Sequence, residues 1–180
     1  MMTAVGIVRE KESGSIANFH STPVTRLEFL LGKQIPYVVV ASLSYVSLLL
    51  MTLLIFQVPL KGSLAALSLG AVVYVMATTG FGMVISTFTK TQVAAIFAAA
   101  ILTMLPSANF SGLLVPTSSL SGAGQLLGLF FPASWFQQIS IGSFTKALGF
   151  AELWPSFAAL ALFILAFTLL SVLGLKKQEA

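Results

Sequence analysis

The 180-residue sequence contains no cysteine and very little charge. Charged residues make up 8% of it and hydrophobic residues 57%, whereas roughly a quarter of the residues of a soluble domain are charged. The lack of cysteine excludes disulfides and cysteine-ligated metal sites. The shortage of charge means that a chain of this length cannot hide its apolar surface from water. We therefore expect an integral membrane protein.

The sequence also lacks the motifs of several chemistries. It has no GxxxxGK[ST] loop, so we expect no ATP site on this chain. Its only histidine, His20, stands in a charged loop and is best interpreted as a surface residue. The sequence also shows no cluster of acidic residues or metal ligands near a span end, which a membrane enzyme would need. The net charge of +4 comes from scattered bases without a Lys/Arg stripe. We predict no catalysis, no cofactor or metal on this chain, and no nucleic-acid partner.

Four apolar runs are long enough to cross a bilayer, which takes about 20 residues. None contains Asp, Glu, Lys, Arg or His, so a proton relay of the usual kind is not expected. Their length favours helices, because lipid requires the backbone to satisfy its hydrogen bonds within each segment. The predicted spans are Ile35–Phe56, Leu64–Phe88, Val93–Val115 and Leu153–Leu175.

Basic residues mark the cytoplasmic side of a membrane protein, and here most of them fall on one side of the predicted spans. Two bases, Lys61 and Lys146, lie on the other side. We therefore expect both chain ends and the turn between the second and third spans to be cytoplasmic. The bases on this side are Arg9, Lys11, Arg26, Lys33, Lys90, Lys176 and Lys177.

The stretch Val8–Lys33 holds much of the charge. Arg9–Glu12 alternates in sign, and the pattern fits either a solvated loop that enforces topology or a docking surface for a cytoplasmic partner. Thr25 and Glu28 form a capping box, which predicts a short amphipathic helix over Thr25–Lys33 at the membrane interface. The apolar start, Met1–Val8, is too short to span.

Small residues in the second and third spans indicate close helix approach. They are Gly80, Gly82, Ala94, Ala95, Ala98 and Ala99, and Pro106 is expected to kink or end the third span.

The stretch Pro116–Phe150 is too long for a turn and too interrupted for a span. Pro132 divides it into two apolar half-helices, Gln125–Phe131 and Trp135–Leu148. Trp135 suits a membrane interface, as does Phe136. Two interpretations are open, a re-entrant hairpin that gates the outer side and a linker that lies on the surface.

Three blocks of the sequence resemble the membrane subunits of ABC-2 type ABC transporters, especially bacterial drug-export-like and ribosome-associated-ATPase-like permeases. The first is "VREKESGSIANFHSTPVTRLEFLLGKQIPY", with the family's charged Arg-Glu-Lys-Glu segment and its "L-x-G-K" helix end. The others are "NFSGLLVP" at Asn109–Pro116 and "FFPASWFQQISIGSFTKAL" at Phe130–Leu148. The likeness keeps the order of the blocks over nearly the whole chain.

The resemblance implies a permease that pairs with an ATP-binding subunit, which holds the ATP and magnesium, and with a second permease copy or a homologous permease. It implies efflux of a hydrophobic or amphipathic substrate across the bacterial inner membrane. The residues expected to couple to the ATPase are Arg9, Glu10, Lys11, Glu12, Gly14, Thr89, Lys90 and Thr91. Those expected in the outer gate or re-entrant segment are Phe110, Ser111, Gly112, Pro116, Pro132, Trp135 and Phe136.

The sequence departs from this family at two points. The family usually has six spans with a large extracytoplasmic domain between the first two, and Met1–Val8 looks like the tail of its second span. We therefore expect a C-terminal half that does not transport alone. Ile141 stands where the family often has arginine, which puts any role of that arginine in doubt.

The predicted fold is an all-α integral membrane domain over 1–180. It has a coupling and interfacial segment at 1–34, a bundle of four transmembrane helices at 35–175 with an extracytoplasmic re-entrant hairpin before the last span, and a cytoplasmic tail at 176–180. The alternative function is a small oligomeric scaffold or channel that does not depend on an ATPase, which would leave Arg9–Glu12 without a role.

Overall fold

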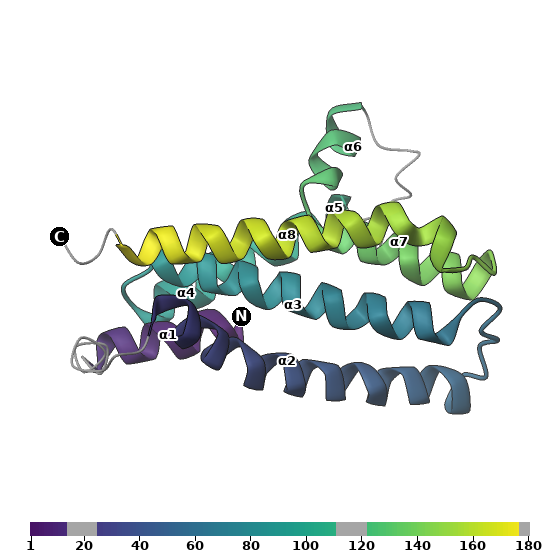
Figure 1. Ribbon diagram of the computed structural model, residues 1–180, viewed down its shortest axis with the longest axis horizontal. Coiled ribbons are helices and arrows are strands. Elements are labelled where there is room, and N and C mark those ends of the chain that lie inside the picture. The colour runs from purple at the N-terminus through teal and green to yellow at the C-terminus, as the bar shows by residue number, and fades with distance from the viewer. Residues whose placement is uncertain (14–24, 111–121, 177–180) are drawn as a thin grey trace.

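The computed structural model describes residues 1–13, 25–110 and 122–176, and all the regular elements in these ranges are helices (Figure 1). Four of the described helical stretches are long and apolar enough to cross a membrane: Leu27–Ile55, Leu64–Phe88, Gln92–Phe110 and Phe150–Gly174. The protein is thus an all-α integral membrane protein with four spans, as the sequence predicts.

The helices follow one another in a simple order. Helix α1 (Met2–Glu12) comes before the spans. The first span is α2 (Arg26–Leu50) with a π-helical end, η2 (Met51–Ile55), and the second is α3 (Leu64–Phe88). The third joins α4 (Gln92–Ala99), a π-helical segment η3 (Ala100–Met104) and α5 (Leu105–Phe110). After α6 (Gly122–Leu129) and α7 (Pro132–Thr145), the last span is α8 (Phe150–Lys176).

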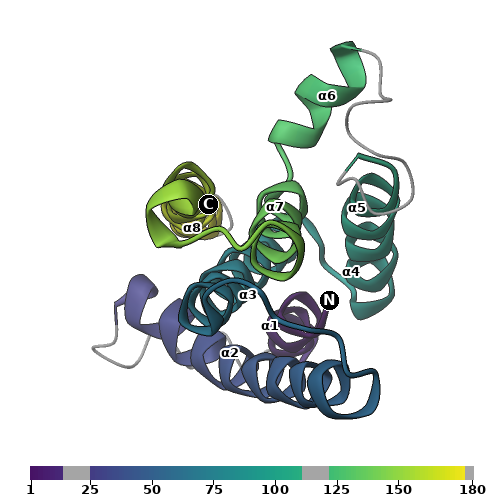
Figure 2. The same cartoon turned by 90° about the vertical axis from the view of Figure 1, so that its right-hand side faces the viewer.

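Helix α3 is the centre of the bundle. It contacts α1, α2, α4, α7 and α8, and Figure 2 shows these helices arranged around it. Small residues on α3 are buried and let its neighbours approach closely, as expected for packing in a membrane. They include Ala66, Gly70, Ala71, Ala77, Gly80 and Gly82.

The described core divides into clusters at different levels of the bundle. One cluster joins α3, α7 and α8 through Leu67, Ile139 and Leu160. Another joins α1 to α3 and α4, and its buried members are Ala4, Val8, Ile85, Ala95 and Ala99. Of the small residues predicted in the third span, Ala95 and Ala99 are buried at the contact with α1 and Ala98 packs against them, whereas Ala94 is exposed.

The outer surface of the bundle is apolar. Along α8 the leucines at 162, 165, 169 and 173 are all more than 60% exposed. They recur every three or four residues, so they form one stripe on the helix. A stripe of this kind is stable only against lipid or another apolar partner, which agrees with a membrane-spanning role.

The structure extends the first predicted span toward the N-terminus. The capping box is confirmed, because Thr25 N–H donates to Glu28 Oε2 at 2.8 Å and the Thr25 side chain accepts from the Glu28 amide. The predicted helix over Thr25–Lys33 is not a separate element, however, since α2 continues through Pro36 to Leu50. The expected boundary between residues 34 and 35 thus lies inside a helix.

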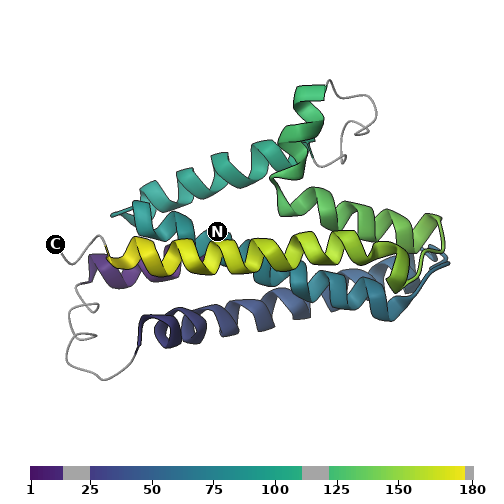
Figure 3. The same cartoon turned by 45° about the horizontal axis from the view of Figure 1, so that its top comes forward.

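The two predicted half-helices before the last span are present as α6 and α7. Phe131 is the N-cap of α7 and Pro132 begins it, a position where proline costs no hydrogen bond. Helix α7 packs on α3 and α8, while α6 projects away from the bundle in all views (Figure 3). The predicted end of the third span at 111–115 falls outside the described residues.

Candidate coupling site

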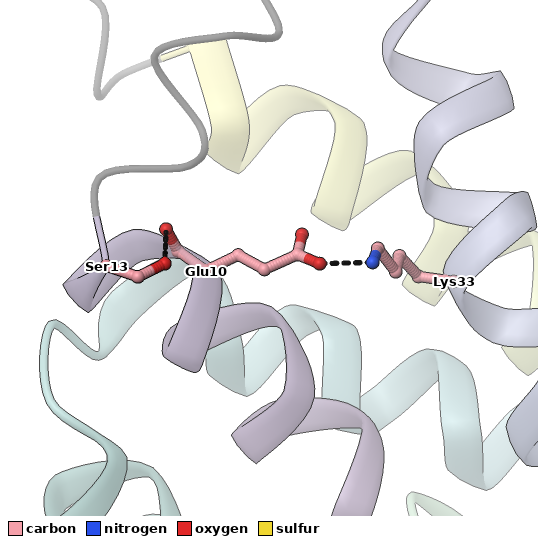
Figure 4. Close-up of polar contacts among 3 residues, drawn as sticks. All are labelled: Glu10, Ser13 and Lys33. Atoms are coloured by element: carbon pink, nitrogen blue, oxygen red, sulfur yellow. Dashed lines mark hydrogen bonds and ion pairs between the residues drawn. The ribbon is translucent and has the colours of Figure 1, made fainter.

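Helix α1 places the charged segment Arg9–Glu12 against the spans. Its apolar residues Ala4, Ile7 and Val8 are fully buried, and this packing holds the helix in place. Arg9 and Lys11 lie in its last turn, where the negative end of the helix dipole favours positive charge. The helix ends at Glu12, and the Ser13 side chain donates to Glu10 O at 3.2 Å (Figure 4). The charged segment is therefore the end of a packed helix and not a solvated loop.

Glu10 connects α1 to the first span. Its carboxylate forms an ion pair with Lys33 of α2, and Figure 4 shows the two side chains pointing toward each other. The Lys33 side chain is 37% exposed and that of Glu10 is 28% exposed. A pair this open to solvent fixes geometry more than it adds stability.

Lys11 connects α1 to the end of the second span. Its ammonium donates to Ser86 O at 2.6 Å, and Ser86 lies in the last turn of α3. A cation at a helix C-terminus is favoured by the dipole and satisfies a carbonyl that lacks a helical partner. Burial lowers the pKa of Lys11 below its usual value.

Glu12 connects α1 to the start of the third span. One carboxylate oxygen accepts from the Gln92 backbone N–H at 2.9 Å, and the other accepts from the Gln92 side-chain amide. Gln92 is the first residue of α4, where unpaired N–H groups and the helix dipole favour an anion. The Gln92 side chain, and then its backbone N–H, lower the pKa of Glu12.

Lys11 and Glu12 thus hold the two helix ends that flank one turn, Thr89–Thr91. The positive residue meets the C-terminal end of α3 and the negative residue meets the N-terminal end of α4. The turn is also capped locally, since Thr91 accepts from Ala94 N–H at 3.3 Å and the Thr89 hydroxyl donates to Ile85 O at 3.0 Å. The structure therefore brings together the two segments that the sequence assigned to coupling.

This region forms one charged end of the bundle, defined by Arg9–Glu12 and Thr89–Thr91. The end of α8 lies at the same end of the molecule (Figure 1). Arg9, Glu12 and Lys90 are exposed there, while Glu10 and Lys11 are half-buried. Gly14, also assigned to coupling, lies outside the described residues.

The predicted gate residues that are described lie around α7. Phe136 stacks on Tyr74 of α3 with ring centroids 4.6 Å apart. Trp135 is half-buried and donates from its indole N–H to Leu129 O at 3.0 Å. Phe110 lies close to this unit, because Ser134, near the start of α7, donates to its carbonyl at 3.3 Å. The remaining gate residues, Ser111, Gly112 and Pro116, lie outside the described residues.

A cavity of about 640 Å³ lies beside this unit. It is bounded by α3, the η3 and α5 part of the third span, the start of α7, and α8. Its walls are apolar and aromatic, with hydroxyl groups at Thr78, Thr103 and Ser107. Such a wall can bind an apolar molecule and fix its orientation through a few polar contacts.

Sequence reasoning missed the contacts that connect these elements. The pairing of Glu12 with Gln92 joins residues 80 apart in the chain, and one sequence cannot reveal it. It also missed Gln34, which is 3% exposed and donates to Met76 O at 2.9 Å and to Thr79 Oγ1 at 3.0 Å. The sequence did contain a signal for Gln34, since this amide directly precedes the apolar run that begins at Ile35. A buried amide must find a hydrogen-bond partner.

The described residues contain no group of three His, Cys, Asp or Glu side chains that could hold a metal ion.

A family model for the ABC-2 family transporter protein matches residues 1–173. The chain is 32% identical over 136 residues to the probable multidrug ABC transporter permease YbhS of Escherichia coli K12, an alignment that covers 76% of this chain and 36% of that protein. It is 29% identical to the probable multidrug ABC transporter permease YbhR of the same organism, over 87% of this chain and 42% of that protein.

A third relative, the inner membrane transport permease YhhJ of Escherichia coli K12, is 28% identical over 98% of this chain and 47% of its own length. The chain therefore spans less than half the length of these curated relatives. No solved structure matches the chain.

Proposed function

Because the chain belongs to the ABC-2 family of transporter proteins and is a membrane subunit of a transporter, we propose that it couples ATP hydrolysis on a separate ATP-binding subunit to efflux. The observation that carries this proposal is the charged end of the bundle. There, the end of α1 and the turn between the second and third spans form one surface. A protein that binds this surface would contact α1, which is itself bound to three of the spans. Two permease chains complete the proposed unit.

The proposed substrate is hydrophobic or amphipathic. The cavity walls support this class, because they combine aromatic and aliphatic side chains with hydroxyl groups. Two of the relatives are named as probable multidrug permeases, which agrees with the same class. The proposed location is the bacterial inner membrane.

The test uses the exposed bases of the charged end. Arg9→Gln and Lys90→Gln together remove two exposed charges, and the described structure gives neither side chain an ion pair. In the complete transporter we expect association with the ATP-binding subunit to weaken about tenfold, which corresponds to a loss of about 1.4 kcal/mol, because exposed bases contribute to electrostatic complementarity across an interface. Pull-down of the ATP-binding subunit at equal permease abundance measures this.

The matched control is Lys61→Gln with Lys146→Gln, which removes two bases from the opposite end of the bundle. This variant should bind the ATP-binding subunit as the unmodified chain does. If the Arg9 and Lys90 variant also binds normally and stimulates ATP hydrolysis normally, the charged end is not the contact. If the unmodified permease recruits no ATP-binding subunit, the proposed function fails in favour of an ATPase-independent scaffold or channel.

The proposed orientation has both chain ends and Lys90 in the cytoplasm, as the distribution of bases predicts. The lack of native cysteine makes a simple test available. In intact cells a membrane-impermeant maleimide should label Lys61→Cys and Lys146→Cys but not Lys90→Cys. Lys90→Cys should become labelled after the membrane is permeabilised. Labelling of Lys90→Cys in intact cells would show the opposite orientation.

A further inference from the structure

The contact between Glu12 and Gln92 connects the charged end to the cavity wall. We infer that Glu12 is a positioning residue that transmits movement of α1 to the third span, an inference that rests on the proposed function. In this role the carboxylate acts inside the chain by holding the first residue of α4, and it does not need to touch the ATP-binding subunit.

The geometry makes this a two-point contact. Both oxygens of Glu12 are used, one by the backbone and one by the side chain of the same residue. A two-point contact fixes the direction of the joined groups as well as their separation. Movement at the end of α1 is therefore delivered to the start of α4.

The helices behind this contact are packed closely. Ala4 and Val8 of α1 belong to one buried cluster with Ala95 and Ala99 of α4. Because the side chains on α4 are small, the two helix backbones approach closely along two turns. The polar contact at the end and the apolar contact along the side make α1 and α4 move as one body.

The third span carries this movement onward. Helix α4 continues into η3 and α5, and these segments line the 640 Å³ cavity through Leu102, Thr103, Met104, Pro106 and Ser107. The π-helical segment η3 is itself part of the cavity wall, and π-helical turns often mark functional sites in helices. A shift of α4 thus reaches the wall that would face a substrate.

Gln92 offers a substitution that removes this contact without touching any residue assigned to the ATPase surface. Gln92 is the first residue of α4, and Thr91 before it is extended, with φ −120° and ψ 148°. Proline is favoured at the first helical position and requires an extended residue before it. Gln92→Pro therefore removes both donors to Glu12 while it preserves the helix start.

In the complete transporter, Gln92→Ala should lower the amount of substrate transported per ATP hydrolysed, and Gln92→Pro should lower it further. We expect about threefold for Gln92→Ala, which removes only the side-chain donor to the charged carboxylate, and about tenfold for Gln92→Pro, which removes both donors. The probe is a fluorescent hydrophobic dye in proteoliposomes that contain the permease and its ATP-binding subunit. Permease abundance and association with the ATP-binding subunit should remain normal in both variants.

Glu10→Gln is the matched control, since it breaks the ion pair to α2 and leaves the contact with α4. Its ratio of transport to hydrolysis should exceed that of Gln92→Pro. A short thiol cross-linker between Glu12→Cys and Gln92→Cys should restore the ratio that the uncross-linked pair loses. An unchanged ratio in Gln92→Pro, or a loss no larger than in Glu10→Gln, overturns the inference. If the unmodified permease shows no ATP-driven transport, the proposed function fails instead.

Discussion

Replacing Leu160 by alanine is expected to destabilise the bundle by about 2–5 kcal/mol, the range for removing a fully buried leucine. Leu160 is 0% exposed and belongs to the cluster that joins α8 to α3 and α7. The loss arises because the neighbouring helices are held at fixed separations and cannot fill the space. Unfolding of the purified protein in detergent micelles, followed by temperature or denaturant, measures the change.

Leu162 is the control for this prediction, because it lies on the same helix but is 68% exposed. In the membrane this side chain contacts lipid, which closes around a smaller residue and leaves no cavity. Leu162→Ala should therefore cost only about 0.5 kcal/mol, the transfer contribution of a leucine at the centre of a span. Equal destabilisation by the two variants would mean that α8 is rotated relative to the structure described here.

Replacing Gly82 by leucine should separate α1 from α3. A Cβ at Gly82 would already lie 3.2 Å from Thr3 Cβ and 3.5 Å from the Ala4 backbone nitrogen, so a leucine side chain has no space. Forcing extra volume into a packed contact costs about 1–3 kcal/mol and sometimes more. We expect α1 to leave its site in a large fraction of molecules.

Exposure of α1 can be measured at Val8, which is 0% exposed. A cysteine introduced at Val8 should react slowly with a maleimide in the otherwise unmodified chain. It should react at least about tenfold faster when Gly82→Leu is added, since about 1.4 kcal/mol is a factor of ten. Gly32→Leu is the control, because a Cβ there has no neighbour within 4 Å. Slow reaction with both leucine variants would disprove the close contact of α1 and α3.

The spans could be predicted because lipid sets a minimum length for an apolar helix. The prediction for Leu64–Phe88 agrees with α3 at both ends. For α2 the sequence held two separate signals, a capping box at Thr25 and an apolar run from Ile35, with Pro36 between them. Only the structure shows that one helix connects them, because a proline in a membrane helix can be accommodated by its surroundings.

The candidate site could be predicted only in part. The charges of Arg9–Glu12 and the turn Thr89–Thr91 are visible in the sequence, but their proximity depends on how α1 packs. That packing left a weak signal in Ala4, Ile7 and Val8, which share one helix face. The partners of Glu10, Lys11 and Glu12 lie on three different spans and leave no local pattern at all.

The contact between Glu12 and Gln92 also sets an order of events during synthesis. The two residues are 80 positions apart, so at about 5–20 residues per second the ribosome takes roughly 4–16 seconds to make the intervening chain. Until α3 and α4 have been inserted as a hairpin, Lys11 cannot donate to the Ser86 carbonyl and Glu12 cannot accept from Gln92 at the start of α4. Docking of α1 is therefore a late step of assembly. It requires the turn between the second and third spans to be on the same side of the membrane as α1.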